Sequence, residues 1–156
     1  CIIQIQNNGG YNMQISSRFT IAVHMLIYIA VYGAEESATS ETLAGSIGVH
    51  PVIVRRILGQ LRRAGLIEVT RGREGGAHMR QPLDQITLRA VFAAVESLGS
   101  HALFRFHESP NPACPLGRNI HGILDGHLME IQHAMEREME RVTLADVTEK
   151  ARALLK

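Results

Sequence analysis

Apolar residues recur at helical spacing in four segments of the first hundred residues. In residues 17–32 this spacing predicts a helix that Ser17 caps and that Gly33 ends. A second, brief helix is expected to begin at the cap residue Ser40 and to end at Gly48, since glycine allows a left-handed stop. Only a short turn separates this helix from the next one.

The third segment predicts the clearest helix. Pro51 suits a first helical position because its missing N–H would have no partner there, and Gly65 offers a left-handed stop. Spacing of i, i+3, i+4 and i+7 gives this helix a buried stripe of Val54, Ile57, Leu58 and Leu61. The fourth segment predicts a helix that Thr87 caps.

Between the third and fourth helices the pattern changes to that of a β-hairpin. Residues 66–70 predict a short strand, residues 71–76 a glycine-rich turn and residues 77–80 a weaker return strand, which Pro82 closes. A short helix, a glycine turn, a second helix and a hairpin together predict a winged helix-turn-helix domain over residues 13–98.

A proline-rich segment and a long apolar seam follow this domain. Residues 99–118 carry three prolines and are expected to form a loop. Residues 119–142 predict one helix, in which apolar side chains recur every three or four residues: Ile120, Leu124, Leu128, Ile131, Met135 and Met139. Residues 143–156 predict a final helix. The seam needs a partner surface, either a second copy of the chain or its own domain.

The expected fold is therefore mainly α with a small β wing, with a long C-terminal dimerisation helix. A composition of 46% apolar and 20% charged residues is typical of globular proteins, and no run approaches the roughly 20 apolar residues that span a bilayer. We expect a cytoplasmic protein that does not bind membranes. Residues 1–12 lack the features of a secretory signal and are expected to be a non-native leader before Met13.

The net charge of the chain is only +1, but the middle third of the sequence is basic. Residues 41–80 contain seven arginines against three glutamates, a surplus of 7 − 3 = 4 positive charges. Several of these arginines lie off the buried stripe of the third helix. A localised basic surface favours a polyanionic partner such as double-stranded DNA. The alternative is a solvated charged face on a winged-helix scaffold that binds proteins.

A helix-turn-helix places the start of its second helix against the bases of the major groove. The residues expected there are His50, Val52, Ile53, Arg55 and Arg56. Arg62 and Arg63 lie two turns further along and are expected to contact phosphates. Arg71 and Arg73 flank Gly72 at the tip of the wing, where the minor groove or the adjacent backbone would be within reach.

The sequence gives little support for catalysis or for metal binding. Neither a nucleophile–base pair, nor a phosphate-cradling loop, nor a dinucleotide fingerprint stands out, so we expect no catalytic residues and no enzyme activity. His121, His127 and His133 are six residues apart, about 120° on a helix, and cannot share one face. We therefore expect no metal site.

The chain resembles the Rrf-type family of bacterial winged helix-turn-helix regulators. The motifs that carry the likeness are Ser16-Ser17-Arg18, Ile47-Gly48-Val49, the run from Leu61 to Ile67 and the run from Arg71 to Gly76. The resemblance implies a homodimer with crossing long helices that binds a palindromic operator. Its half-sites would lie about 10 base pairs apart, so that each subunit reads one major groove.

Several members of this family hold an iron–sulfur cluster through three cysteines in the segment that corresponds to residues 101–117. Here that segment contains Cys114 alone, and one thiolate cannot replace a usual set of four ligands. The chain thus resembles the cluster-free branch, and no cofactor is expected. Cys114 is a candidate sensor of oxidants or electrophiles beside Arg118 and a helix N-terminus; the alternative is a small buried hydrophobic residue. A repressor that responds to such a signal or to a small molecule is the predicted function.

Overall fold

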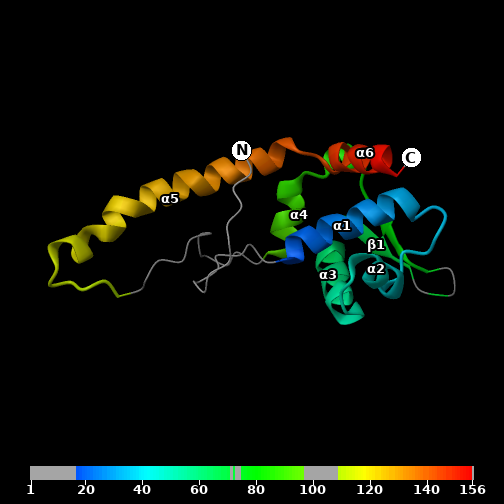
Figure 1. The fold of residues 1–156 in the computed structure, drawn as a ribbon, viewed down its shortest axis with the longest axis horizontal. Helices are drawn as coiled ribbons and strands as arrows, with labels where there is room; N and C mark the ends of the chain where they lie inside the picture. The colour runs from blue at the N-terminus through cyan, green and yellow to red at the C-terminus, as the bar shows by residue number, and fades with distance from the viewer. Residues whose placement is uncertain (1–16, 71, 73–74, 97–108, 156) are drawn as a thin grey trace.

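The computed structural model describes residues 17–70, 72, 75–96 and 109–155. The predicted leader, part of the proline-rich segment and both wing-tip residues Arg71 and Arg73 lie outside this part of the chain. Within it, helices alternate with one small antiparallel sheet: α1 (Ser17–Tyr32), α2 (Ser40–Ile47), α3 (Pro51–Arg63), β1 (Ile67–Val69), β2 (Ala77–Met79), the 3-10 helix η1 (Leu83–Gln85), α4 (Leu88–Val95), α5 (Pro115–Arg141) and α6 (Leu144–Leu154). The predicted fold class is confirmed (Figure 1).

A single hydrophobic core joins the first four helices, the hairpin and α6. The stripe predicted for α3 is buried throughout, as Val54, Ile57, Leu58 and Leu61 all lie in this core. From α1 the core takes Met25 and Leu26, and from α6 it takes Leu144, each fully buried. Burying side chains of this size is the main source of the stability of the domain.

Local signals set the ends of the two middle helices. Gly48 and Gly65 have φ angles of 75° and 73°, the left-handed region that glycine reaches without strain, and each ends a helix as predicted. The expected cap of α2 is wrong by one residue. Thr39 caps it, because its hydroxyl accepts a hydrogen bond from the Thr42 N–H at 3.1 Å, while Ser40 is the first residue of the helix.

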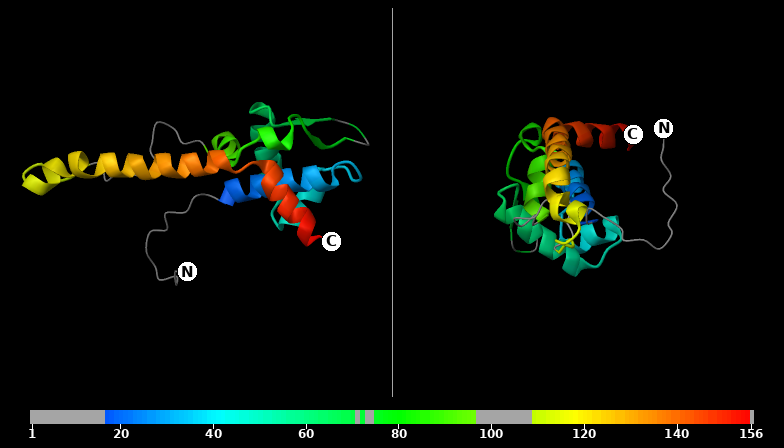
Figure 2. Two further views of the ribbon diagram at one scale, coloured as in Figure 1. Left: turned by 90° about the horizontal axis from the view of Figure 1, so that it is seen from above. Right: turned by 90° about the vertical axis from the view of Figure 1, so that its left-hand side faces the viewer.

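The long helix α5 begins at Pro115, four residues before the expected position 119. Proline is tolerated at a first helical position, and Cys114 takes the cap position before it, so residues 115–118, expected in the loop, belong to the helix. Its 27 residues correspond to a length of about 40 Å. Figure 1 and Figure 2 show α5 projecting from the globular part as a rod, with the hairpin at the opposite end of the molecule.

Two backbone hydrogen bonds fix the place where α5 joins the globular part. The Leu88 N–H donates to the Val142 carbonyl at 2.9 Å, and the Leu144 N–H donates to the Ile86 carbonyl at 2.7 Å. Thr143 caps α6 and forms a reciprocal capping box with Asp146. The beginnings of α4 and α6 are therefore locked together at the end of α5.

No helix of the described residues is long and apolar enough to cross a membrane.

Candidate nucleic-acid interface

The first turn of α3 presents apolar side chains to solvent. His50 caps the helix, since its Nδ1 accepts a hydrogen bond from the Val52 N–H at 3.3 Å, and Pro51 occupies the first helical position. Val52 and Ile53 remain 57% and 41% exposed. Neither side chain adds to the core, so the fold gives no reason for them. Apolar side chains at this position of a helix-turn-helix can contact the methyl group of thymine.

The remaining faces of α3 follow from its helical period of about 100° per residue. Val52, Arg56 and Arg63 lie opposite the buried stripe, and all three are exposed. Arg55 and Arg62 lie on the flank between this outer face and the core, where both line a groove beside the wing. The structure therefore divides the four predicted arginines of α3 into an outward-facing pair and a wing-facing pair.

Arg55 is held by the first turn of α2, which sequence reasoning missed. Its Nη2 contacts Oε1 of Glu41 at 2.5 Å, and its Nε donates to the Ser40 hydroxyl at 3.2 Å. Hydrogen bonds from Ser40 and then from Arg55 hold the pKa of the Glu41 carboxyl below its usual range. An acidic residue 14 positions before an arginine is no recognisable pattern, because only the crossing of α2 and α3 brings the two together.

The wing is anchored to the segment before α2. In its two-stranded ladder Glu68 faces His78, and at the base of the turn the Ala77 N–H donates to the Ala38 carbonyl at 3.1 Å. A Cβ at Gly76 would lie 3.0 Å from the Ala38 nitrogen, tighter than ordinary van der Waals contact, so glycine favours this close approach of the two backbones. Gly72, with a φ of 118°, also requires glycine.

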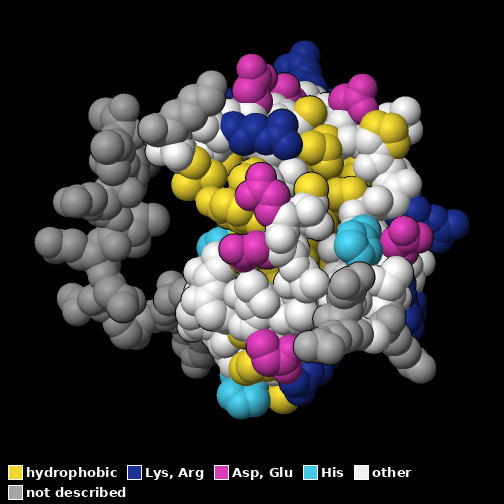
Figure 3. Space-filling view, turned by 90° about the vertical axis from the view of Figure 1, so that its right-hand side faces the viewer, with side chains coloured by type: hydrophobic (Ala, Val, Ile, Leu, Met, Phe, Trp, Pro, Cys, Tyr) yellow, Lys and Arg dark blue, Asp and Glu magenta, His cyan; other side chains and the backbone are white. Residues whose placement is uncertain are grey.

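A groove of about 540 Å³ lies between α3, the start of α2 and the base of the wing. Its lining combines glycines and apolar side chains with a polar group made of Thr39, Ser40, Glu41, Arg55, Arg62 and Thr70. The end of the molecule opposite α5, where the hairpin lies, carries scattered charges of both signs among apolar side chains rather than one basic cluster (Figure 3). The candidate interface is therefore a composite of α3, the first turn of α2 and the wing.

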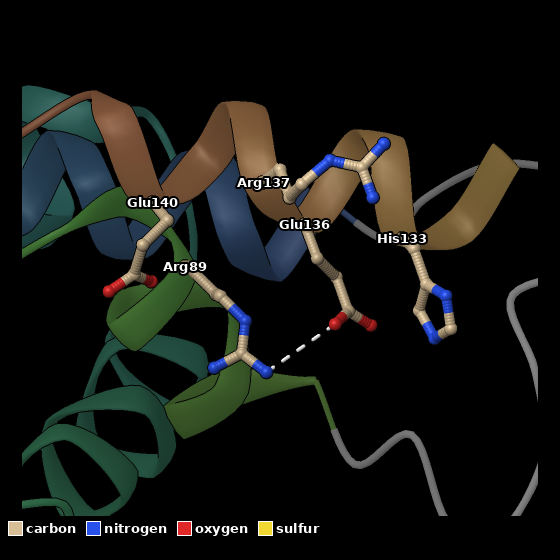
Figure 4. Close-up of a pocket in the computed structure, with 5 residues that line it drawn as sticks. All are labelled: Arg89, His133, Glu136, Arg137 and Glu140. Atoms are coloured by element: carbon tan, nitrogen blue, oxygen red, sulfur yellow. Dashed lines mark hydrogen bonds and ion pairs between the residues drawn. The ribbon is translucent and has the colours of Figure 1, made fainter. Parts of the chain in front are cut away.

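The polar face of α5 contacts its own domain. Arg89 of α4 contacts Glu136 at 3.4 Å (Figure 4). The Thr87 hydroxyl donates to Glu140 at 3.3 Å. His133 and Arg137 line the same open pocket beside Arg89 (Figure 4). Hydrogen bonds from Gln132 and Arg89 hold the pKa of Glu136 below its usual range, although partial burial opposes them.

The apolar seam of α5 is largely uncovered within one chain. Leu124 and Ile131 are 37% and 52% exposed, and Ile120, Leu128, Met135 and Met139 are half-buried. Among the described residues, α5 contains no side chain that the chain itself buries completely. The alternative in which the seam folds back onto its own domain is therefore not the arrangement of this structure.

Cys114 is exposed and immediately precedes α5. Its N–H donates to the Asn111 carbonyl at 3.2 Å, and a Cβ on Gly117 would lie 2.5 Å from the same oxygen, so the preceding turn packs tightly on the helix. Its exposure argues against the small buried hydrophobic residue that was the alternative. The described residues bring no three His, Cys, Asp or Glu side chains together for a metal ion.

The fold and the exposed start of α3 define a winged helix-turn-helix protein, the architecture of DNA-binding transcription regulators. The sequence profile of the Rrf2 family, described as iron-dependent transcriptional regulators, matches residues 15–150. This protein belongs to the Rrf2 family and is a DNA-binding transcription regulator.

Named relatives agree with this assignment. YwnA of Bacillus subtilis, an HTH-type transcriptional regulator by name, is 37% identical over 133 residues, which cover 85% of this chain and 96% of YwnA. The HTH-type regulator NsrR of Geobacillus kaustophilus is 26% identical over 92% of this chain and 97% of its own length.

Solved structures show the same fold. IscR of T. potens aligns with a TM-score of 0.66 over 88% of both chains, at 20% identity. CymR of B. subtilis, the global cysteine regulator, aligns with a TM-score of 0.64 over 88% of this chain and 97% of its own, at 21% identity.

The donor set of this chain does not fit an iron–sulfur cluster. Apart from Cys1 the sequence has only Cys114, and the first turn of α5 around it offers neither a second thiolate nor a grouped set of histidines or carboxylates in the described residues. A cluster usually takes four ligands, most often thiolates. No role of this chain is therefore derived through such a group.

Replacing Gly76 by alanine tests whether the wing is held by its close approach to Ala38. Because the added Cβ must displace backbone at Ala38, we expect Gly76→Ala to lower the free energy of unfolding by about 1 to 3 kcal/mol. Chemical denaturation at fixed protein concentration measures this free energy of unfolding. Gly45→Ala is the matched control: its Cβ meets nothing within 4 Å inside α2, so stability should rise by about 0.5 to 1 kcal/mol. Equal effects of the two changes would contradict the anchor.

Proposed function

We propose that this protein is a homodimeric, sequence-specific repressor without catalytic activity, which places two copies of α3 in successive major grooves of a palindromic operator. The observation that carries the proposal is the exposed first two turns of α3, where Val52, Ile53 and Arg56 face solvent beside the groove next to the wing. Such turns offer both apolar and bidentate polar contacts to base edges.

The arginines of α3 contact different parts of DNA, depending on the face of the helix on which they lie. Arg56 lies next to Val52 on the outer face and is positioned for base contacts, whereas Arg63 lies two turns further along, where phosphates would pass. Arg62 lines the groove beside the wing and also suits a phosphate. His50, whose Nδ1 caps α3, lies at the edge of the same surface, and Arg71 and Arg73 would extend it along the wing.

A second copy of the chain is the proposed partner of the α5 seam. The face of α5 that contacts α4 is polar, through Arg89 and Glu136, so the apolar face is left for another molecule. Seams of this spacing pair with a second helix by inserting side chains between those of the partner. A two-fold dimer also gives the symmetry that a palindromic operator requires.

The proposed signal is an oxidant or an electrophile that reacts with Cys114. Two features support this role: Cys114 is exposed, and it immediately precedes the long helix α5. Reactive cysteines have to be accessible to solvent, as Cys114 is. Modification there would act at the beginning of the helix that joins the two subunits.

Arginine variants test the DNA interface and its division of roles. We expect Arg56→Ala to weaken binding to the preferred duplex by about 1 to 3 kcal/mol and to relax base preference at one position. Arg63→Ala should weaken all duplexes by a similar factor and lower the salt slope by about one. Gel shifts across salt concentrations measure both effects, with exposed Arg118 of α5 changed to alanine as the control. Absent or salt-insensitive binding would favour the protein-interaction scaffold instead.

Two apolar residues on opposite faces of α5 test the dimer. Ile131 and Met129 are 52% and 54% exposed in one chain, but they lie about 160° apart on the helix, and only Ile131 belongs to the seam. We expect Ile131→Asp to produce monomers and to reduce binding to a palindromic duplex, while Met129→Asp stays dimeric. Sedimentation measures the molecular mass. A monomeric wild-type protein, or equal effects of both changes, would refute the proposed seam.

Alkylation tests the sensor. We expect Cys114 in the folded protein to react with N-ethylmaleimide faster than free cysteine, as measured by mass spectrometry of the peptide that contains it. Alkylation should also change the affinity for the preferred duplex, and Cys114→Ser should lose that response while it binds DNA normally. A reaction rate no faster than that of the free thiol would overturn the sensor role.

A further inference from the structure

The first turn of α2 and the second turn of α3 are joined by a closed ring of hydrogen bonds. The Arg55 guanidinium donates to the Glu41 carboxylate through Nη2 and to the Ser40 hydroxyl through Nε, at 2.5 and 3.2 Å. The Ser40 hydroxyl in turn donates to the other Glu41 oxygen at 2.8 Å. Each of the three side chains thus contacts the other two.

This ring lies inside the proposed DNA interface. All three residues line the groove between α3 and the wing, which Arg62 also lines. The side chains of Arg55 and Glu41 are 57% and 63% exposed, so the ring faces solvent rather than the core. An exposed ion pair of this kind contributes little to stability. The presence of a carboxylate where a polyanion would bind therefore calls for a role in binding.

The pairing changes what Arg55 can do at a DNA surface. Hydrogen bonds from Ser40 and Arg55 hold the pKa of the Glu41 carboxyl below its usual range, so the charged form that pairs with Arg55 is favoured. The pair has no net charge, so Arg55 adds little to the sequence-independent attraction of phosphates. A phosphate that approached Arg55 would also meet the negative Glu41 carboxylate.

We propose that Glu41 is a specificity-determining residue, which holds Arg55 away from phosphates and releases it only to a base that offers two acceptors. The inference rests on the proposed function, which places the start of α3 in the major groove. Guanine presents its N7 and O6 atoms side by side and accepts two hydrogen bonds from one arginine, so it can replace both bonds of the ring. A phosphate can also accept two hydrogen bonds from one arginine, but its negative charge is repelled by the Glu41 carboxylate, whereas guanine is uncharged.

Removing the Glu41 charge tests this role. Two probes are needed: a mixed-sequence duplex, and the duplex that the wild-type dimer selects from a randomised library. We expect Glu41→Gln to raise affinity for the mixed-sequence duplex about fivefold near 0.1 M salt and to increase its salt slope by about one. Affinity for the selected duplex should rise less, so the ratio of the two affinities falls.

Two further variants separate the pairing from general repulsion. Glu68→Gln removes the same charge from the exposed side of β1 and leaves Arg55 untouched, so it should leave the affinity ratio unchanged. In an Arg55→Gln background, Glu41→Gln should no longer change the ratio, because the residue on which it acts is gone.

The outcomes distinguish this inference from the function on which it rests. If the wild-type protein selects a duplex but Glu41→Gln leaves the affinity ratio unchanged, or changes it equally without Arg55, the role of Glu41 is overturned. If the wild-type protein binds DNA but selects no duplex from the library, the sequence-specific function itself fails, and the role of Glu41 fails with it.

Discussion

Two backbone hydrogen bonds, between residues 86–88 and residues 142–144, hold the arrangement on which the rest of the molecule depends. They tie the beginning of α4 to the end of α5, and the buried Leu144 anchors the adjoining α6 in the core. A helix of about 40 Å moves its far end widely when its base rotates slightly. The short hydrogen bonds at its base therefore determine the direction in which the apolar seam faces.

The same junction sets the position of the apolar seam of α5 relative to α3. Helix α4 packs on both α3 and α5. A shift of α5 would therefore be passed to α3 through this one short helix, whose Val91 and Val95 are buried. In the proposed dimer, the separation of the two α3 helices depends on this chain of packed elements. A signal at the beginning of α5 would act on DNA through the angle at which two such helices cross.

In the proposed interface, the neighbours of α3 balance affinity for DNA against base specificity. Its outer face is basic and apolar, while the flank toward the wing carries an arginine that Glu41 neutralises. A surface made only of free arginines would bind any duplex through phosphates. In the proposed interface, one acidic residue among the arginines lowers this general attraction, so that base contacts contribute a larger share of binding. In the proposed dimer, the polar contact of α5 with α4 similarly leaves the apolar seam for the second subunit.

Short-range signals in the sequence determined the helices, the hairpin and the buried stripe of α3. Pro51, Gly48 and Gly65 act through backbone geometry alone, and helical periodicity identifies the side of α3 that is buried. Tertiary structure decided what depends on distant residues. Thr39 rather than Ser40 caps α2, and Ser40 instead contacts Arg55, because the crossing of two helices brings these hydroxyl and guanidinium groups together. Side-chain pairs between elements leave no periodic trace in a sequence, since their contacts depend on packing in three dimensions.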